Sequence, residues 1–259
     1  MKINVVKIGG AVVEDEAALA LFLKAFSAME GLKILVHGGG RTASNVCGKL
    51  GIRTVMSGGR RITDGETLKV VTAVYAGLVN KDIVARLQAE GVNAFGVCGA
   101  DFGIVKAVRR PVTEEGVDFG FVGDPVMVGN EILTRLVSDG FVPVISPITH
   151  DGQGQLLNTN ADTVASEIAR AMSPDFEVTL TYCFEKEGVL DGEGNIIESI
   201  NPVRYSSLKE EGIVSGGMLP KLDNAFSALN AGVHNVRITS ASAPEGGTLI
   251  TLKSLRMQN

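Results

Sequence analysis

The sequence predicts an α/β fold, a three-layer αβα sandwich whose central sheet is mainly parallel. Short apolar runs rich in β-branched residues alternate with longer segments that carry apolar residues at helical spacing. Two of the apolar runs, Ile3–Ile8 and Lys33–Val36, lead almost directly into glycines. Because ligands bind beyond the carboxyl ends of parallel strands, we expect these glycine loops to mark the functional edge of the sheet.

The first forty residues are predicted to form a β-α-β unit, in which a helix over 14–29 joins the two strands. The other predicted helices span 41–50, 65–90, 131–139, 163–171 and 205–212, and a last one opens at 215–221 and stops at Gly232. The other predicted strands span 93–99, 104–112, 117–128, 142–148, 176–184, 233–239 and 249–252. The turn Glu114-Glu115-Gly116 makes 104–112 and 117–128 a β-hairpin, and we interpret 57–64 as a loop.

The pattern changes after Ser173-Pro174, so we divide the chain into two lobes, 1–173 and 174–259, that share one sheet. The 259 residues carry a formal net charge of −5 without a basic cluster, which disfavours nucleic acid or an anionic membrane as partner. The chain has neither a leader pattern nor an apolar run long enough to cross a bilayer. Three isolated cysteines indicate neither a disulfide framework nor a zinc site, and we expect a cytoplasmic protein.

The glycine triplet Gly38-Gly39-Gly40 lies between a predicted strand end and a helix start. Free backbone N–H groups and the helix dipole favour an anion at such a place, either a phosphate or a developing oxyanion. A tight turn without a ligand is the alternative, because glycine also serves turns and close packing.

Two lysines are out of place by local rules. Lys7 is a cation near the end of a buried strand, and Lys221 follows Pro220 in the first turn of a helix, where a cation opposes the helix dipole. Both positions are explained if each lysine serves an anion. Lys7 could instead extend from the strand end to water.

Polar side chains also gather at two other helix starts. Arg60 and Arg61 precede one helix, and an arginine fork suits a carboxylate, although a solvated charge is the alternative. Asn158, Asn160 and Asp162 alternate, so an extended segment presents all three to one side. Either of the last two could cap the following helix, which leaves two of the three for binding.

Lysines, glycine loops and one acid at strand ends indicate phosphoryl transfer, in which a protein positions two reactants and neutralises charge. The sequence contains no G-x-x-x-x-G-K-[ST] loop, and G-x-G-x-x-G does not follow the first strand.

Five motifs in order resemble the amino acid kinase family. They are Val6-Lys7-Ile8-Gly9-Gly10, Val36-His37-Gly38-Gly39-Gly40, Gly59-Arg60-Arg61-Ile62-Thr63, Leu157-Asn158-Thr159-Asn160-Ala161-Asp162 and Gly216-Gly217-Met218-Leu219-Pro220-Lys221.

The resemblance implies transfer of the γ-phosphoryl group of ATP to the γ-carboxylate of N-acetyl-L-glutamate, for arginine biosynthesis. Lys7 and Lys221 would bridge the transferred group, and Asp162 would hold both lysines. The resemblance gives the backbone N–H groups of Gly10, Gly39 and Gly40 to the phosphoryl group and to the attacking carboxylate. The substrate-binding residues that it implies are Gly39, Gly40, Arg61, Asn158 and Asn160, with 120–123 covering the acyl group.

The resemblance also implies that 1–173 binds the acylated amino acid and 174–259 the nucleotide, with Mg²⁺ on the nucleotide phosphates and no protein metal site. The nucleotide-binding residues that it implies are Lys7, Gly9, Gly10, Glu185, Gly188, Gly217 and Lys221. One segment, 182–188, departs from the family pattern, because Glu185 stands in for an aspartate and Lys186 for an apolar residue.

Three alternatives stay open: another kinase of this family, a kinase for N-succinylglutamate, and an amino-acid sensor without turnover. The chain begins directly with its first strand, and the extra N-terminal helix of arginine-inhibited hexamers in the family does not precede it. We therefore expect a homodimer without strong arginine feedback.

Overall fold

The structure is a computed structural model that describes residues 1–184, 186–216 and 218–253. Its helical segments are α1 (Gly10–Glu14), α2 (Glu16–Ala28), α3 (Gly40–Lys49), α4 (Gly65–Thr72), η1 (Ala73–Val79), α5 (Asn80–Ala89), η2 (Asp101–Gly103), α6 (Asn130–Ser138), α7 (Ala161–Met172), α8 (Pro202–Glu210) and α9 (Met218–Asn230). Its strands are β1 (Lys2–Ile8), β2 (Leu32–His37), β3 (Val55–Ser57), β4 (Arg60–Ile62), β5 (Ala94–Cys98), β6 (Val105–Arg109), β7 (Gly123–Val128), β8 (Val142–Ser146), β9 (Ile148–His150), β10 (Leu156–Asn158), β11 (Glu177–Phe184), β12 (Ser199–Ile200), β13 (Asn235–Ser240) and β14 (Thr248–Ile250).

Eight strands form one central sheet in the order β12-β14-β13-β11-β1-β2-β8-β5. Neighbouring strands run parallel except for β13 and β14, which are antiparallel. Parallel neighbours need crossover connections, and the helices of the chain supply them. The prediction of a mainly parallel sheet is therefore confirmed, and strands from both sides of residue 173 join in it.

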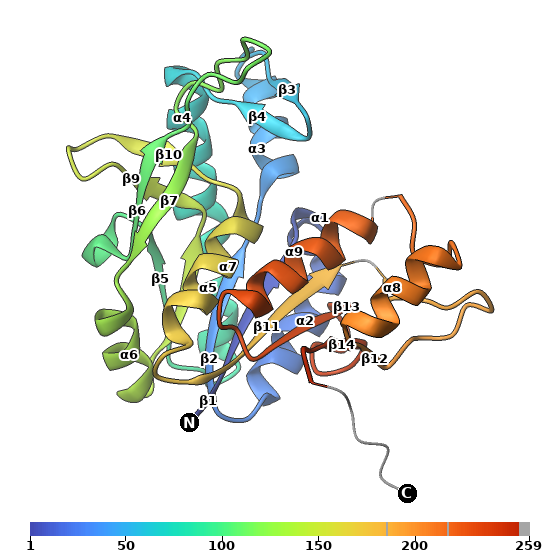
Figure 1. Ribbon diagram of the computed structural model, residues 1–259. Helices are drawn as coiled ribbons and strands as arrows, with labels where there is room; N and C mark the ends of the chain where they lie inside the picture. Colours follow the sequence, from blue (N-terminus) through green and yellow to red (C-terminus); the bar gives the residue numbers. More distant parts are fainter. Residues whose placement is uncertain (185, 217, 254–259) are drawn as a thin grey trace, which may run out of the picture.

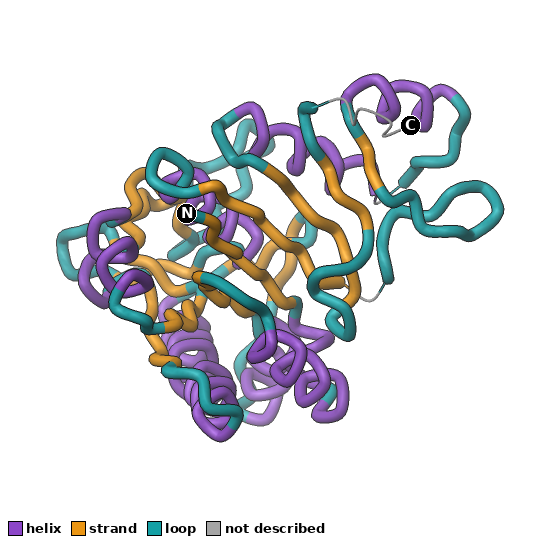
Figure 2. Tube along the Cα trace, turned by 90° about the horizontal axis from the view of Figure 1, so that it is seen from below, coloured by secondary structure: helices purple, strands orange, loops and turns teal. Residues whose placement is uncertain are grey.

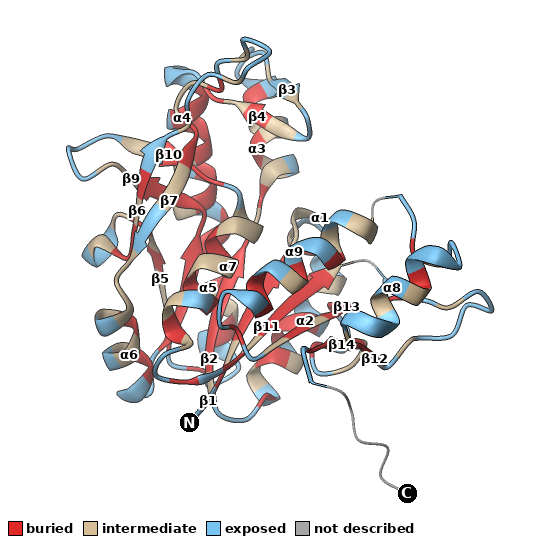
Figure 3. Ribbon diagram, viewed as in Figure 1, coloured by how far each residue is buried: buried red, intermediate tan, exposed pale blue. Residues whose placement is uncertain are grey.

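Helices cover both faces of this sheet (Figures 1 and 2). On one face α6, α7 and α9 pack against the strands, and on the other α5 packs against β5 and β8 and against α2. Alternate residues of β1 enter different cores, since Ile3 and Val5 belong to the first and Val6 and Ile8 to the second. Figure 3 shows the central strands as buried, which explains why their sequences are apolar runs.

A smaller sheet, β10-β9-β6-β7, and the two-stranded β3-β4 lie on one side of the central sheet in Figure 1. Four predictions change in and around these sheets. The expected strand 117–128 begins only at Gly123, so the connection from β6 is longer than the predicted turn 114–116. The expected loop 57–64 contains β4 and the end of β3, which pair as a hairpin. The expected single strand 142–148 ends at Ser146, and Ile148 starts β9 in the smaller sheet. The expected helix 65–90 contains a π-helical segment, η1.

The carboxyl ends of β1, β2 and β11 meet at one edge of the central sheet, because β1 pairs in parallel register with both neighbours. The chain continues from β1 into α1 at Gly10 and from β2 into α3 at Gly40. Two helix starts and the end of β11 therefore surround the same edge. No helix in the described residues combines the length and the apolar character that crossing a bilayer requires.

Candidate active site

Lys7 and Asp162 form an ion pair at the carboxyl edge of the sheet. The ammonium nitrogen of Lys7 lies 2.7 Å from Oδ1 of Asp162. Only 9% of the Lys7 side chain is exposed, against 46% for Asp162. A buried ammonium group needs an anionic partner, so Asp162 explains how a lysine is tolerated in a buried strand. The alternative of a Lys7 side chain that extends freely to water is wrong.

Lys221 reaches the same place from α9. Its ammonium nitrogen lies 3.6 Å from the centroid of the Phe184 ring, and the ammonium nitrogen of Lys7 lies 5.8 Å from that centroid. Both distances are within the range of a cation–π interaction. Asp162 and Lys221 also line one small cavity beside Phe184. Two lysines more than 200 positions apart in the sequence therefore converge on one aromatic ring.

The glycine loops bring backbone N–H groups to this edge. A Cβ atom on Gly10 would lie 3.5 Å from the nitrogen of Gly40 and 3.8 Å from that of Gly39, so the starts of α1 and α3 are adjacent. Gly39 has a φ of 156°, and a Cβ there would lie 3.1 Å from Cδ1 of Tyr75. Only glycine fits this position. The adjacent starts of the two helices give this corner the N–H groups and the dipoles that favour an anion.

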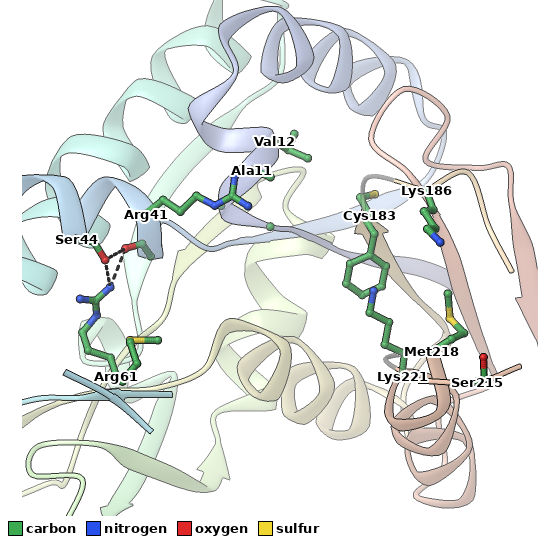
Figure 4. A pocket seen from close by; sticks show the side chains of 15 residues that line it. Ala11, Val12, Arg41, Ser44, Arg61, Cys183, Lys186, Ser215, Met218 and Lys221 are labelled. Atoms are coloured by element: carbon green, nitrogen blue, oxygen red, sulfur yellow. Dashed lines mark hydrogen bonds between the residues drawn. The ribbon is translucent and has the colours of Figure 1, made fainter. Parts of the chain in front are cut away.

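Arg61 fixes the α3 side of the site. Its guanidinium group donates to the carbonyl oxygen of Gly40 and to Oγ of Ser44, each at 2.8 Å, and to Oγ1 of Thr54 at 3.2 Å. Figure 4 shows the contacts with Gly40 and Ser44 as dashed lines. Arg61 is buried, so its charge is presented from a fixed position and is not a solvated loop charge.

The structure distinguishes Asn160 from Asp162 as helix cap. Oδ1 of Asn160 accepts the backbone N–H groups of Asp162 and Thr163 and caps α7, which leaves the Asp162 carboxylate for Lys7. Asn158 is buried and donates from Nδ2 to Oγ1 of Thr63 at 3.0 Å. All three side chains therefore have defined positions beside the cavities of the site.

The main cavity has a volume of about 820 Å³. Arg41, Ser44 and Arg61 lie on one side of it and Lys186, Met218 and Lys221 on the other (Figure 4). Four of its described lining side chains are cationic and none is acidic. A cavity of this charge attracts a polyanion such as a triphosphate. We call it the nucleotide cavity.

A second cavity of about 190 Å³ adjoins the nucleotide cavity and shares Gly40, Met56 and Arg61 with it. Its other lining residues are Gly38, Gly39, Gly59, Arg60, Tyr75, Val122, Pro147, Asn158, Thr159, Asn160 and Ala161. We call it the substrate cavity. The glycine triplet Gly38, Gly39 and Gly40 forms part of its wall.

Cys183 also lines the nucleotide cavity. Burial raises the pKa of its thiol to about 12, and the charge of Lys7 only partly opposes this. The thiol therefore stays protonated at neutral pH, and a thiol is a poor nucleophile. The site can position two reactants and neutralise charge, which is the chemistry of direct phosphoryl transfer.

A sequence model of the amino acid kinase family matches residues 2–240. The chain belongs to the amino acid kinase family. The acetylglutamate kinase of Bacteroides fragilis is 55% identical over 254 residues, which cover 96% of this chain and 97% of that protein. The acetylglutamate kinase of Methanopyrus kandleri is 41% identical over 242 residues, 92% of this chain and 94% of that protein.

Solved structures of this fold superpose on nearly the whole chain. The protein smu.665 from Streptococcus mutans has a TM-score of 0.77 and 25% identity, over 97% of this chain and 99% of that one. The carbamate kinase of Giardia lamblia bound to AMP-PNP has a TM-score of 0.70 and 12% identity, again over 97% and 99%. The second match shows that the fold persists at low identity.

Two residues implied for nucleotide binding in this amino acid kinase, Glu185 and Gly217, lie outside the described residues. Gly188 borders a smaller cavity that shares Lys186, Ser215 and Met218 with the nucleotide cavity. A Cβ on Gly188 would lie 2.8 Å from Oγ1 of Thr248, so close packing also requires glycine here. Gly9 lines the nucleotide cavity, and a Cβ there would lie 3.7 Å from the Lys7 nitrogen.

Sequence reasoning did not single out Phe184 or Tyr75. Phe184 ends β11, and its ring contacts both lysines. Tyr75 lies in the π-helical segment and packs on Gly39. An aromatic residue at the carboxyl end of a strand was a usable signal for Phe184, whereas local sequence gives no signal for a contact between positions 39 and 75.

Proposed function

We propose that this amino acid kinase transfers the γ-phosphoryl group of ATP to the γ-carboxylate of N-acetyl-L-glutamate, as one step of arginine biosynthesis. Relatives named acetylglutamate kinase match nearly their full length and nearly all of this chain, at up to 55% identity. The observation that carries the proposal is the convergence of Lys7, Lys221 and the glycine N–H groups between two adjoining cavities.

The assigned roles follow from charge. Lys7 and Lys221 neutralise the phosphoryl oxygens, on which negative charge is spread in the transition state, and Asp162 positions Lys7. N–H groups of Gly10, Gly39 and Gly40 donate to the phosphoryl group and to the γ-carboxylate. A γ-carboxylate oxygen of the substrate forms the new bond to the γ-phosphorus of ATP. The bond between this phosphorus and the oxygen that bridges the β- and γ-phosphates breaks, and ADP leaves. Neither step needs a covalent intermediate on the protein.

The α-carboxylate is assigned to Arg61 and the amide of the acyl group to Asn158, because both side chains line the substrate cavity. Asn160 lines it as well, although its Oδ1 already caps α7. The adenosine end is assigned to the side of the nucleotide cavity near Lys186 and Gly188, which belongs to 174–253. We accordingly assign substrate binding to the lobe 1–173 and nucleotide binding to the lobe that follows.

Mg²⁺ is assigned to the phosphate oxygens of ATP, where it would neutralise charge. In the described residues, no three histidine, cysteine or acidic side chains gather as a metal site, and Asp162, the carboxylate beside the lysines, is already paired. The residues present therefore fit magnesium that arrives with the nucleotide.

We further propose a cytoplasmic homodimer without strong arginine feedback. Sedimentation velocity of the purified protein would measure the assembly, and a hexamer would contradict this part of the proposal.

The test of the reaction is a coupled assay for ADP with N-acetyl-L-glutamate, with L-glutamate and N-acetyl-L-aspartate as controls. Hydroxylamine in the same reaction traps an acyl phosphate as a hydroxamate. We expect ADP and hydroxamate in equal amounts with N-acetyl-L-glutamate and little of either with the controls. Binding of N-acetyl-L-glutamate by calorimetry without ADP formation would instead indicate a sensor.

A further inference from the structure

His37 and Asn80 form a buried hydrogen-bonded pair next to the glycine triplet. Both side chains are fully buried, one at the end of β2 and the other at the start of α5. Nδ1 of His37 lies 2.8 Å from the carbonyl oxygen of Gly38, and Nε2 lies 3.1 Å from Nδ2 of Asn80. Neither side chain is among the described lining residues of the two cavities, so the roles assigned above leave this pair unused.

The polar atoms of the pair have complementary roles. A carbonyl oxygen only accepts, so the proton of the neutral His37 ring lies on Nδ1, and Nε2 accepts from Asn80. Burial is the main cause that lowers the pKa of His37 to about 4, so the ring is neutral at neutral pH. Nδ2 of Asn80 also donates to the carbonyl oxygen of Val144 at 2.9 Å, and its Oδ1 accepts from the ammonium group of Lys81 at 3.1 Å. These partners hold both side chains in one arrangement.

Two irregular features of the fold place Asn80 against His37. A Cβ atom on Gly96 of β5 would lie 1.8 Å from Oδ1 of Asn80, so only glycine leaves room for the amide. The π-helical segment η1 ends immediately before Asn80. In an α-helix, side chain 80 would be rotated by about 140° from side chain 75. A π-helix bonds residues five apart, so Tyr75 and Asn80 come to nearly the same side, where Tyr75 packs on Gly39.

The hydrogen bond from His37 holds one peptide group of the glycine loop. The carbonyl of Gly38 and the N–H of Gly39 belong to the same planar trans peptide, so a fixed carbonyl also fixes the direction of this N–H. The N–H of Gly38 donates to the carbonyl oxygen of Ile8 at 3.0 Å, which anchors the preceding peptide. Glycine has wide conformational freedom, so this peptide needs such a contact to keep one orientation.

We propose that His37 and Asn80 are positioning residues that direct the Gly39 N–H at the oxygens on which charge develops during phosphoryl transfer. His37 holds the peptide between Gly38 and Gly39, and Asn80 acts through His37. Neither side chain touches a substrate. The inference rests on the function proposed above, because that reaction supplies the acceptor of the Gly39 N–H.

The experiment measures steady-state kinetics of His37→Phe, Asn80→Ala and the double variant with ATP and N-acetyl-L-glutamate. His37→Phe keeps a buried ring without its hydrogen bonds. We expect kcat to fall about 10- to 100-fold in His37→Phe and about 5- to 20-fold in Asn80→Ala, because a misdirected N–H stabilises the transition state less. KM for ATP should change less than about twofold. The double variant should be no worse than His37→Phe, because the two residues act in series.

Lys33→Met is the matched control for loss of a buried polar contact. Lys33 is buried near the start of β2, at the end opposite to His37, and its ammonium group donates to the carbonyl oxygens of Phe26, Ser27 and Met29. This variant should lose stability in urea unfolding but keep the wild-type kcat. A readout that does not depend on activity is the ¹⁵N–¹H correlation spectrum of protein labelled with ¹⁵N-histidine. It should show the His37 proton on Nδ1.

A proton on Nε2 of His37 instead of Nδ1 would overturn the inference, and so would a wild-type kcat in folded His37→Phe and Asn80→Ala. Losses that multiply in the double variant would show that Asn80 does not act through His37. An equal loss of kcat in Lys33→Met would reduce the effect to general destabilisation. Absence of ADP formation by the wild-type protein would instead contradict the proposed function, which the histidine spectrum does not test.

Discussion

The ammonium nitrogen of Lys7 lies 2.7 Å from Oδ1 of Asp162, which joins the end of β1 to the first turn of α7. If Asp162 acts by positioning Lys7, the two residues contribute as one unit. We expect Lys7→Gln to lower kcat by about 10²- to 10³-fold, as for other groups that stabilise transition-state charge. Asp162→Asn should lower it by about tenfold, and the double variant should be no worse than Lys7→Gln.

Steady-state kinetics of the two single variants and the double variant complete this cycle. Asp175→Asn is the control, because Asp175 is an exposed aspartate shortly after α7. Independent losses that multiply in the double variant would show that Asp162 does not act through Lys7.

Phe184 is the ring on which both lysines converge. A cation–π interaction contributes about 0.5–2 kcal/mol, so we expect Phe184→Leu to lower kcat/KM about 2- to 30-fold. Phe184→Tyr keeps an aromatic face and should retain most of the activity. The same loss in both variants would point to a packing effect, and an unchanged kcat/KM in Phe184→Leu would contradict the role of the ring.

Gly39 combines a positive φ with the contact to Tyr75. We expect Gly39→Ala to destabilise the protein by about 1–3 kcal/mol, the cost of a strained backbone conformation, and to raise KM for the acylglutamate. Urea unfolding and initial-rate kinetics measure the two effects. Gly48→Ala on α3 is the matched control, because a Cβ there meets nothing within 4 Å, and it should be neutral or stabilising by up to about 1 kcal/mol. Equal shifts in both variants would contradict the special role of position 39.

His37 is fully buried at the end of β2, where Asn80 Nδ2 contacts its Nε2 at 3.1 Å. Burial, as the main cause, lowers its pKa to about 4, against about 6.5 when unfolded. The unfolded chain therefore binds a proton first as the pH falls. The stabilisation is complete above about pH 6.5 and decreases toward pH 4, with about 2 kcal/mol lost at pH 5.

Urea unfolding at pH 7.5 and pH 5.0 measures this loss, and His37→Gln should show a smaller difference between the two pH values. His150 and His234 are present in both proteins, so their contributions cancel in the comparison. An identical pH dependence of the two proteins would show that His37 is not the responsible group.

Local patterns predicted most of the secondary structure. Apolar runs and glycines located β1, β2 and β11, and helical spacing located α2, α7 and α9. Both signals are local, because a buried strand or helix face requires apolar residues at a characteristic spacing. The hairpin β3-β4 escaped prediction, since strands of three residues carry too little periodicity. The boundary between β8, which ends at Ser146, and β9, which starts at Ile148, was also not predicted. A continuous apolar run does not indicate that its last residues belong to a different sheet.

The sequence by itself determined the sheet type, the glycine loops and which charged residues were anomalous, since each depends on residues within a few positions of each other. Only the tertiary structure decided that Asn160 caps α7 while Asp162 pairs with Lys7, that Phe184 receives both lysines, and that Arg61 donates to Gly40 and Ser44 of α3. The physical reason is that partner choice depends on which distant side chains the sheet order brings within a few ångströms. Local residue order does not encode that distance.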